Sequence, residues 1–107
     1  MTFKWPSKDP DETVDFSMDW SRYLNDQATI DNVTWFVDNA SGVKTELANA
    51  NDIVNGIQFV GKSNTNTVAT INVALGTNNL KYKFSCQIRD TSGTIAERTV
   101  TLPIKES

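Results

Sequence analysis

The sequence predicts an all-β protein, a β-sandwich of about seven short strands preceded by an extended N-terminal segment. Three observations lead to this prediction. Apolar and polar side chains alternate with a period of two in several short runs, turn-forming residues separate these runs, and no convincing helical periodicity interrupts them. With 107 residues, of which 38% are hydrophobic and 21% charged, the chain has the size and composition of one globular domain.

The first two strands are predicted at residues 14–20 and 33–37. In both runs the apolar side chains share one parity and are expected to enter the core; they are Val14, Phe16, Met18, Trp20, Val33, Trp35 and Val37. Between the runs, residues 21–24 have the composition of a short helical turn that brings Leu24 over one end of the core. Ile30 has the wrong parity for the second strand, which predicts a bulge or a strand start just after it.

The middle of the chain is less regular. Residues 38–42 have turn composition, because Asn and Gly tolerate positive φ angles. Residues 43–60 are expected to hold one or two short strands, the second around Phe59. Residues 63–67 are polar, which predicts a loop.

Regular alternation returns in the last third of the chain. Turn residues at 76–79 and 91–93 separate three predicted strands. Pro103 has no amide proton to donate, so it belongs at a sheet edge or near the end of the last strand. The side chains expected to face the core are Ala69, Ile71, Val73, Leu75, Leu80, Tyr82, Phe84, Cys86, Ile88, Val100, Leu102 and Ile104.

Composition and charge restrict the classes of partner. The net charge is −3 and the lysines and arginines are scattered, so no nucleic-acid partner is expected. No apolar run approaches the ~18 residues of a membrane span, and the first residues lack the apolar stretch of a signal peptide, so neither a membrane partner nor secretion is expected. The single cysteine, Cys86, has no second cysteine to pair with, which is consistent with synthesis in a reducing cytoplasm.

An enzymatic function is not expected either. The chain has no histidine, and its five glycines are dispersed instead of forming a phosphate-binding loop. Cys86 lies in an apolar alternation, where a reactive thiolate is disfavoured. Two carboxylates could in principle hydrolyse a glycoside, but a lone sandwich of this size offers no obvious cleft. No cofactor is expected.

Charged side chains gather at two places in the sequence. Five carboxylates lie within eleven residues, and they are Asp9, Asp11, Glu12, Asp15 and Asp19. Carboxylate oxygens are calcium ligands, but this spacing fits no recognised calcium loop, so we expect a solvated acidic face and no metal site. Near the end of the chain, Arg98 is open to two interpretations, a local ion pair with Glu97 or a contact with another subunit.

The first twelve residues are the most informative segment. Residues 1–12 are predicted to form an extended N-terminal docking arm and residues 13–107 the sandwich. Pro6 and Pro10 fix their own φ angles and push the preceding residues towards extended conformations. Trp5 on such an arm either folds back onto its own domain or anchors in a neighbouring molecule, and the sequence leaves both possibilities open. For the second possibility, the predicted partner-binding residues are Phe3, Trp5, Pro6, Lys8, Asp9 and Pro10.

Both ends of the chain resemble a known family. The first end contains Trp5-Pro6-Ser7-Lys8-Asp9-Pro10-Asp11-Glu12, Asp15-Phe16-Ser17-Met18-Asp19-Trp20-Ser21, Leu24, Ile30 and Val33-Thr34-Trp35. The second contains Tyr82-Lys83-Phe84-Ser85-Cys86-Gln87-Ile88, Gly93 and Glu97-Arg98-Thr99-Val100-Thr101-Leu102. These stretches are similar to motifs of small tailed-phage virion proteins, the fiber-tail adaptors, such as W-P-x-K-D-P-D-E and D-Y-x-x-D-W-S-x-x-L. Phe16 stands where the family commonly has Tyr, Ala96 replaces an Asp, and residues 39–62 do not match well.

The resemblance implies an immunoglobulin-like β-sandwich, in which Tyr82 is similar to the corner tyrosine whose hydroxyl hydrogen-bonds backbone near a turn. It also implies a non-enzymatic structural protein of a tailed-phage virion, made in the host cytoplasm. Such an adaptor links tail and tail fibers through its N-terminal arm, and its partners are other phage structural proteins and copies of itself in a symmetric assembly.

Two alternative functions remain at this point. The first is a capsid decoration, or cementing, protein, and the less favoured second is a surface glycan-binding module in which Trp5 or Phe36 stacks on a sugar ring. For the arm itself, docking predicts that Trp5→Ala leaves a folded monomer that enters particles poorly, whereas folding back predicts that the isolated domain unfolds.

Overall fold

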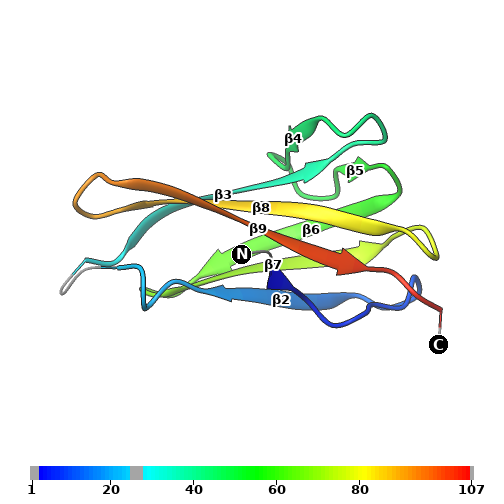
Figure 1. Ribbon diagram of the computed structural model, residues 1–107, viewed down its shortest axis with the longest axis horizontal. Coiled ribbons are helices and arrows are strands. Elements are labelled where there is room, and N and C mark those ends of the chain that lie inside the picture. The colour runs from blue at the N-terminus through cyan, green and yellow to red at the C-terminus, as the bar shows by residue number, and fades with distance from the viewer. Residues whose placement is uncertain (1–2, 25–27, 107) are drawn as a thin grey trace.

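The computed structural model describes residues 3–24 and 28–106, and it shows the predicted β-sandwich (Figure 1). Its strands are β1 (Phe3–Lys4), β2 (Val14–Asp19), β3 (Ile30–Asp38), β4 (Lys44–Glu46), β5 (Ile53–Val54), β6 (Ile57–Asn64), β7 (Val68–Leu75), β8 (Lys81–Asp90) and β9 (Ile95–Pro103). Across the described residues, no helix has the length and apolar composition needed to cross a membrane.

The strands form two sheets that face each other. The larger sheet has the order β1-β9-β8-β3-β4, and the smaller has the order β2-β7-β6-β5. Neighbouring strands are antiparallel except for β1, which runs parallel to β9. With β2-β7-β6 as strands B-E-D and β4-β3-β8-β9 as strands C′-C-F-G, this is the order of immunoglobulin-like sandwiches.

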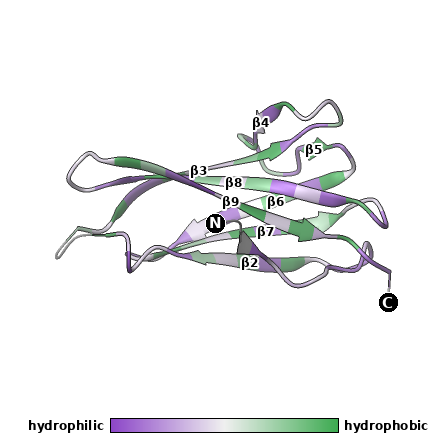
Figure 2. Ribbon diagram, in the orientation of Figure 1, coloured by the Kyte–Doolittle hydropathy of each residue, from purple (hydrophilic) through white to green (hydrophobic). Residues whose placement is uncertain are grey.

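The core lies between the sheets and is built from the predicted alternation. Figure 2 shows hydrophobic and hydrophilic residues alternating along the long strands. Trp20 and Trp35 are fully buried, as predicted, because they share the inward parity of their segments. The other fully enclosed apolar side chains come from both sheets and include Val37, Ile57, Ile71, Val73, Phe84, Ile88, Val100, Leu102 and Ile104.

Two local predictions are confirmed by the pairing of the strands. The register between β3 and β8 shifts between Ile30 and Asn32, which is the predicted irregularity at the start of that strand. Pro103 is the last residue of β9, near the end of the strand as predicted.

Other local predictions are wrong, and each has a backbone cause. Leu75 was expected to face the core, but its side chain is 46% exposed because its φ of +62° turns the end of β7 away from strand geometry. Leu80 is 38% exposed because β8 begins only after it. The polar composition of residues 63–64 predicts a loop, but these residues continue β6 and pair with Thr70 and Ala69.

The predicted tyrosine corner is present. The Tyr82 hydroxyl donates a hydrogen bond to the carbonyl oxygen of Asn55 at 2.6 Å and accepts one from the amide of Thr77 at 2.9 Å. Gly56 has a φ of +89°, and a β-carbon there would lie 2.6 Å from Thr77 Oγ1 and 3.3 Å from the Tyr82 hydroxyl. Only glycine fits this position, so the corner joins the turn before β6 to the turn before β8.

Candidate partner-binding surface around the N-terminal segment

The N-terminal segment lies along the edge of the larger sheet. β1 pairs with Val100 and Thr101 of β9, and the amide of Trp5 continues this pairing by donating to the carbonyl oxygen of Thr101 at 2.9 Å. Further along, the amide of Lys8 donates to the carbonyl oxygen of Pro103 at 3.0 Å. Residues 3–8 are therefore held by main-chain hydrogen bonds to the last strand of their own domain.

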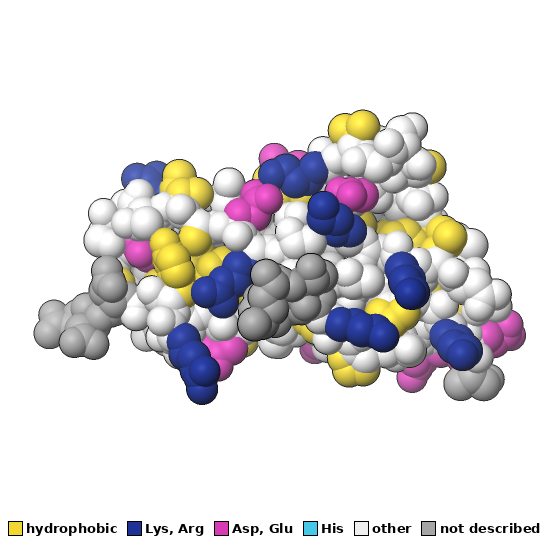
Figure 3. Space-filling view, in the orientation of Figure 1, with side chains coloured by type: hydrophobic (Ala, Val, Ile, Leu, Met, Phe, Trp, Pro, Cys, Tyr) yellow, Lys and Arg dark blue, Asp and Glu magenta, His cyan; other side chains and the backbone are white. Residues whose placement is uncertain are grey.

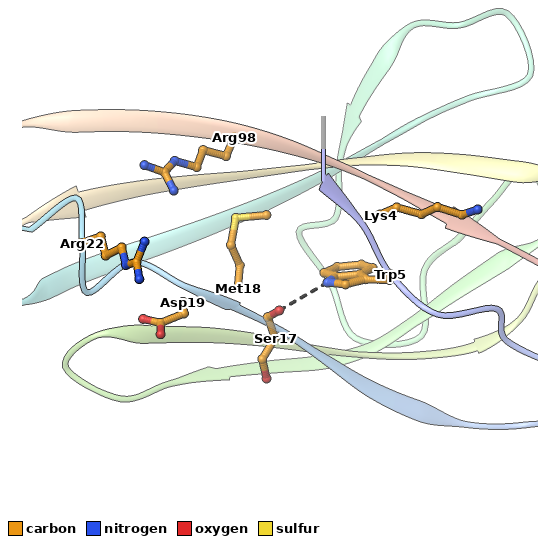
Figure 4. A pocket seen from close by; sticks show the side chains of 7 residues that line it. All are labelled: Lys4, Trp5, Ser17, Met18, Asp19, Arg22 and Arg98. Carbon is orange, nitrogen blue, oxygen red and sulfur yellow. Dashed lines mark hydrogen bonds between the residues drawn. The ribbon is translucent and has the colours of Figure 1, made fainter. Parts of the chain in front are cut away.

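Trp5 enters the core of its own sandwich. Its side chain is 8% exposed and stacks on Phe16, with ring centroids 4.8 Å apart and an interplanar angle of 16°. Tilted contacts to Trp35 and Phe84 follow at 5.9 and 5.7 Å. The indole Nε1 donates a hydrogen bond to the carbonyl oxygen of Ser17 at 3.2 Å (Figure 4). Of the two possibilities that the sequence left open for this indole, the structure shows folding back.

Lys8 is also buried, which nothing in the sequence pattern indicated. Its ammonium donates hydrogen bonds to the carbonyl oxygens of Leu75 at 2.6 Å and Asp9 at 2.8 Å. Burial lowers the pKa of Lys8, while the carboxylates of Glu12, Asp9 and Asp11 act in the opposite direction. The side chain therefore ties the N-terminal segment to the end of β7 in the other sheet.

The remaining predicted contact residues lie at or near the surface. Pro6 is exposed, and Asp9 and Pro10 are half-buried; of Phe3 only the backbone is described. Between Trp5 and Lys8, the segment thus presents Pro6 and Ser7 outward. Whether these residues touch another protein stays a prediction.

An acidic turn, residues 9–12, connects this segment to β2. The turn is closed by its own hydrogen bonds: the Asp9 amide donates to Glu12 Oε1 at 3.0 Å, and the Asp11 amide donates to Asp9 Oδ1 at 2.8 Å. Asp11 and Glu12 are exposed, as expected of a solvated acidic face. Among the residues that the structure describes, no three His, Cys, Asp or Glu side chains are placed to hold a metal ion.

An open groove lies beside Trp5 on the side of the sandwich between β2 and β9. Its volume is about 520 Å³, and its lining residues are Lys4, Trp5, Ser17, Met18, Asp19, Arg22 and Arg98 (Figure 4). The guanidinium of Arg98 lies 4.9 Å from the centre of the Trp20 ring. Glu97 forms an ion pair with Lys44 at 3.0 Å. No sequence pattern indicates this groove, because three segments that are distant in sequence form it.

The two aromatic side chains considered for sugar binding do not form an open platform. Trp5 is buried, and Phe36 is half-buried with the Lys44 ammonium 4.6 Å from its ring centre. This geometry gives no support to a glycan-stacking surface at these residues.

Taken together, the fold and the surface are those of an immunoglobulin-like domain with a strapped-down N-terminal segment and an open lateral groove. A protein-family model described as podophage GP4 fiber-tail adaptor protein gp77 matches residues 8–103, so this chain belongs to that family. No curated protein sequence matches the chain. The family makes it a structural phage protein, a component of the virion that associates with tail and fiber proteins.

Proposed function

We propose that this protein joins the phage tail to its fibers, and that the N-terminal segment contributes to the joint. The observation that carries the adaptor role is the family match over residues 8–103, which covers the acidic turn and every strand except β1. The fold is consistent with such a mechanical role, because a rigid immunoglobulin-like sandwich can hold contact surfaces in fixed positions.

Within the proposed contact set, the residues divide into two roles. Trp5 and Lys8 are buried, so they position the segment instead of touching a partner directly. Pro6, with the half-buried Asp9 and Pro10, supplies the outward surface, and Phe3 completes the set. An extended segment fixed in this way would present its surface without paying a large ordering entropy on binding.

A variant that changes only the outward surface tests the role of the segment. Pro6→Glu places a charge on the exposed side of the segment, and we expect it to reduce incorporation into particles by at least about tenfold while the isolated domain melts like wild type. Val43→Glu is the matched control, since Val43 is 58% exposed in the distant turn between β3 and β4. Normal incorporation of the Pro6 variant would contradict a role of the N-terminal segment in the contact between tail and fibers.

Counting copies in purified particles tests the adaptor role itself. Quantitative mass spectrometry against the major capsid protein should give roughly six, twelve or eighteen copies, the numbers expected of a symmetric tail assembly. Hundreds of copies would identify a capsid decoration protein instead, and no copies would contradict a place in the virion.

A further inference from the structure

The turn between β5 and β6 consists of Asn55 and Gly56, and it is the one place in the sequence where glycine follows asparagine. Both residues have positive φ angles, +50° and +89°. Two-residue hairpin turns of this kind favour Asn followed by Gly, because these residues tolerate positive φ. The fold therefore accounts for this pair of residues.

The corner at Tyr82 prevents a bulkier residue from replacing the glycine. A β-carbon at Gly56 would lie 2.6 Å from Thr77 Oγ1 and 3.3 Å from the Tyr82 hydroxyl. Because glycine has no side chain, nothing on residue 56 itself hinders an approach to its amide nitrogen. The glycine that permits the corner thus also leaves this nitrogen accessible to the asparagine side chain before it.

The side chain of Asn55 and the amide of Gly56 are exposed and unoccupied. Both residues are exposed to solvent, and the region around β4 and β5 projects from the body of the sandwich (Figures 1 and 3). Among the described residues, neither the Asn55 carboxamide nor the Gly56 amide has a hydrogen-bond partner. An exposed carboxamide therefore lies next in the chain to an amide that is free to react.

Two other asparagines provide a comparison within the same chain. Asn51 and Asn79 have similar φ angles, +73° and +71°. The amide of Asp52, which follows Asn51, donates a hydrogen bond to a main-chain carbonyl oxygen at 3.1 Å, and the amide of Leu80 does the same at 3.1 Å. Both of these amides also belong to residues with side chains. The structure thus sets Asn55 apart from asparagines of the same backbone conformation.

We infer that Asn55 is a site of spontaneous deamidation in the native protein, with water as the only co-reactant. The Gly56 nitrogen loses its proton and forms a bond to Cγ of Asn55. The bond from Cγ to the carboxamide nitrogen breaks, and ammonia leaves with that proton. Water then opens the resulting cyclic imide: addition at Cγ gives aspartate, and addition at the main-chain carbonyl carbon gives isoaspartate.

Local opening of the hairpin gives the reaction its path. Ring closure requires rotation about the bond between Cα and the carbonyl carbon of Asn55, and the Tyr82 hydroxyl holds that carbonyl oxygen at 2.6 Å. The hairpin must therefore open before the ring can close. β5 pairs with β6 through only two residues, so this opening loses few contacts and does not require the domain to unfold.

The isoaspartate product changes the corner. In isoaspartate the peptide link runs through Cγ, and the former main-chain carbonyl group becomes a free carboxylate. The Asn55 carbonyl is the acceptor of the Tyr82 hydroxyl, and the next carbonyl, that of Gly56, accepts the amide of Gly76 at 2.9 Å. A longer link displaces these two acceptors relative to each other, so we expect isoaspartate to destabilise the domain through the corner.

Peptide mapping of the aged protein tests the inference. The purified full chain is incubated at physiological temperature in mildly alkaline buffer made with water enriched in heavy oxygen, then digested and analysed by mass spectrometry. Enzymatic methylation of isoaspartate distinguishes the two products. Asn55 should convert at least about tenfold faster than Asn51 and Asn79, with incorporation of one heavy oxygen atom. In Asn55→Gln, the longer side chain should leave this position unconverted.

Two results would overturn the inference. One is conversion of Asn55 no faster than that of Asn51 and Asn79. The other is an intact Asn55 in the native protein together with rapid conversion in urea, which would show that the fold protects this turn. Neither result bears on the proposed function, because the readout is a chemical change in the purified chain.

The effect on the corner is measured separately. The isoaspartate form, isolated by chromatography, should unfold at lower urea concentration than freshly purified Asn55→Asp, which carries the same added charge on an unchanged backbone. Equal stability of the two proteins would contradict the effect on the Tyr82 corner.

Discussion

Single side chains fix the relative positions of turns and sheets in this domain. Tyr82 and Lys8 have related roles, because each is a buried side chain whose polar group donates hydrogen bonds to backbone carbonyl oxygens. Backbone groups of irregular segments need such partners when they are buried. Cys86 is different, since it acts as a small apolar side chain in the alternation of β8.

Removing the Tyr82 hydroxyl should destabilise the domain without changing its fold. Tyr82→Phe removes the hydrogen bonds to the Thr77 amide and the Asn55 carbonyl oxygen, and because both of these residues are exposed, water can replace part of the loss, which leaves a cost of about 0.5–1.5 kcal/mol. Urea unfolding followed by tryptophan fluorescence measures the loss. Tyr23→Phe, at a half-buried tyrosine at the edge of the core, is the control and should cost less.

The thiol of Cys86 should make the stability depend on alkaline pH. Burial raises the pKa of Cys86 from 9.0 to about 12, so above pH 9 the unfolded chain loses a proton that the folded chain keeps. The free energy of unfolding should therefore fall from pH 9 towards pH 12, by about 1 kcal/mol per pH unit. In Cys86→Ala, the free energy of unfolding should decline less with pH. Urea titrations at intervals of about one pH unit between about pH 8 and about pH 11 measure this difference. An equally steep decline in the variant would show that the Cys86 thiol is not the cause of the pH dependence.

At the scale of elements, the N-terminal segment is the part whose role the structure changes most. β1 contributes only two residues to the larger sheet, yet the segment that follows it inserts Trp5 between the sheets and Lys8 beneath the end of β7. It thus closes part of the gap between β2 and β9. We expect this segment to stabilise the domain far more than its short strand would indicate.

Truncating Trp5 should therefore destabilise the isolated domain. Trp5→Ala removes the contacts to Phe16, Trp35 and Phe84, at a cost of about 3–5 kcal/mol, which is a large part of the stability of a domain of this size. Thermal unfolding by circular dichroism measures the change, with Ile53→Ala at a 58% exposed position as the control. If the variant melts like wild type, the burial of this indole contributes little, and a docking role for it regains support.

For the molecule as a whole, stability is expected to be concentrated in the centre of the sandwich. β8 lies between β3 and β9 and makes extensive pairings with both, whereas β5 pairs with β6 through only two residues. Local opening requires less free energy where fewer contacts are lost. The region from β4 to β5 also coincides with the stretch that does not resemble the family motifs.

Hydrogen exchange followed by NMR should reproduce this gradient. Amides of Phe84, Cys86 and Trp35 should exchange most slowly, and those of Ile53 and Val54 most rapidly among strand residues. Equal protection of β5 and β8 would mean that the domain opens only as one cooperative unit.

Most of the fold could be read from the sequence because alternation is a local property. The parity of Phe84, Cys86 and Ile88 is set by neighbours two residues away, so the inward face of β8 follows from the chain alone. The same reasoning failed at Leu75, where a positive φ angle interrupts the alternation at the end of its strand. The sequence motifs also pointed to the adaptor family, which the family match confirms over residues 8–103.

The sequence by itself determined the β-sandwich class, through the alternation of apolar and polar side chains along the strands, together with most of the apolar core and the corner at Tyr82. Only the tertiary structure decided where Trp5 and Lys8 go and that Lys4, Arg22 and Arg98 share one groove. The physical reason is the range of the interactions. Burial of an indole or an ammonium depends on an opening between two sheets, and that opening exists only after strands far apart in sequence have been packed together.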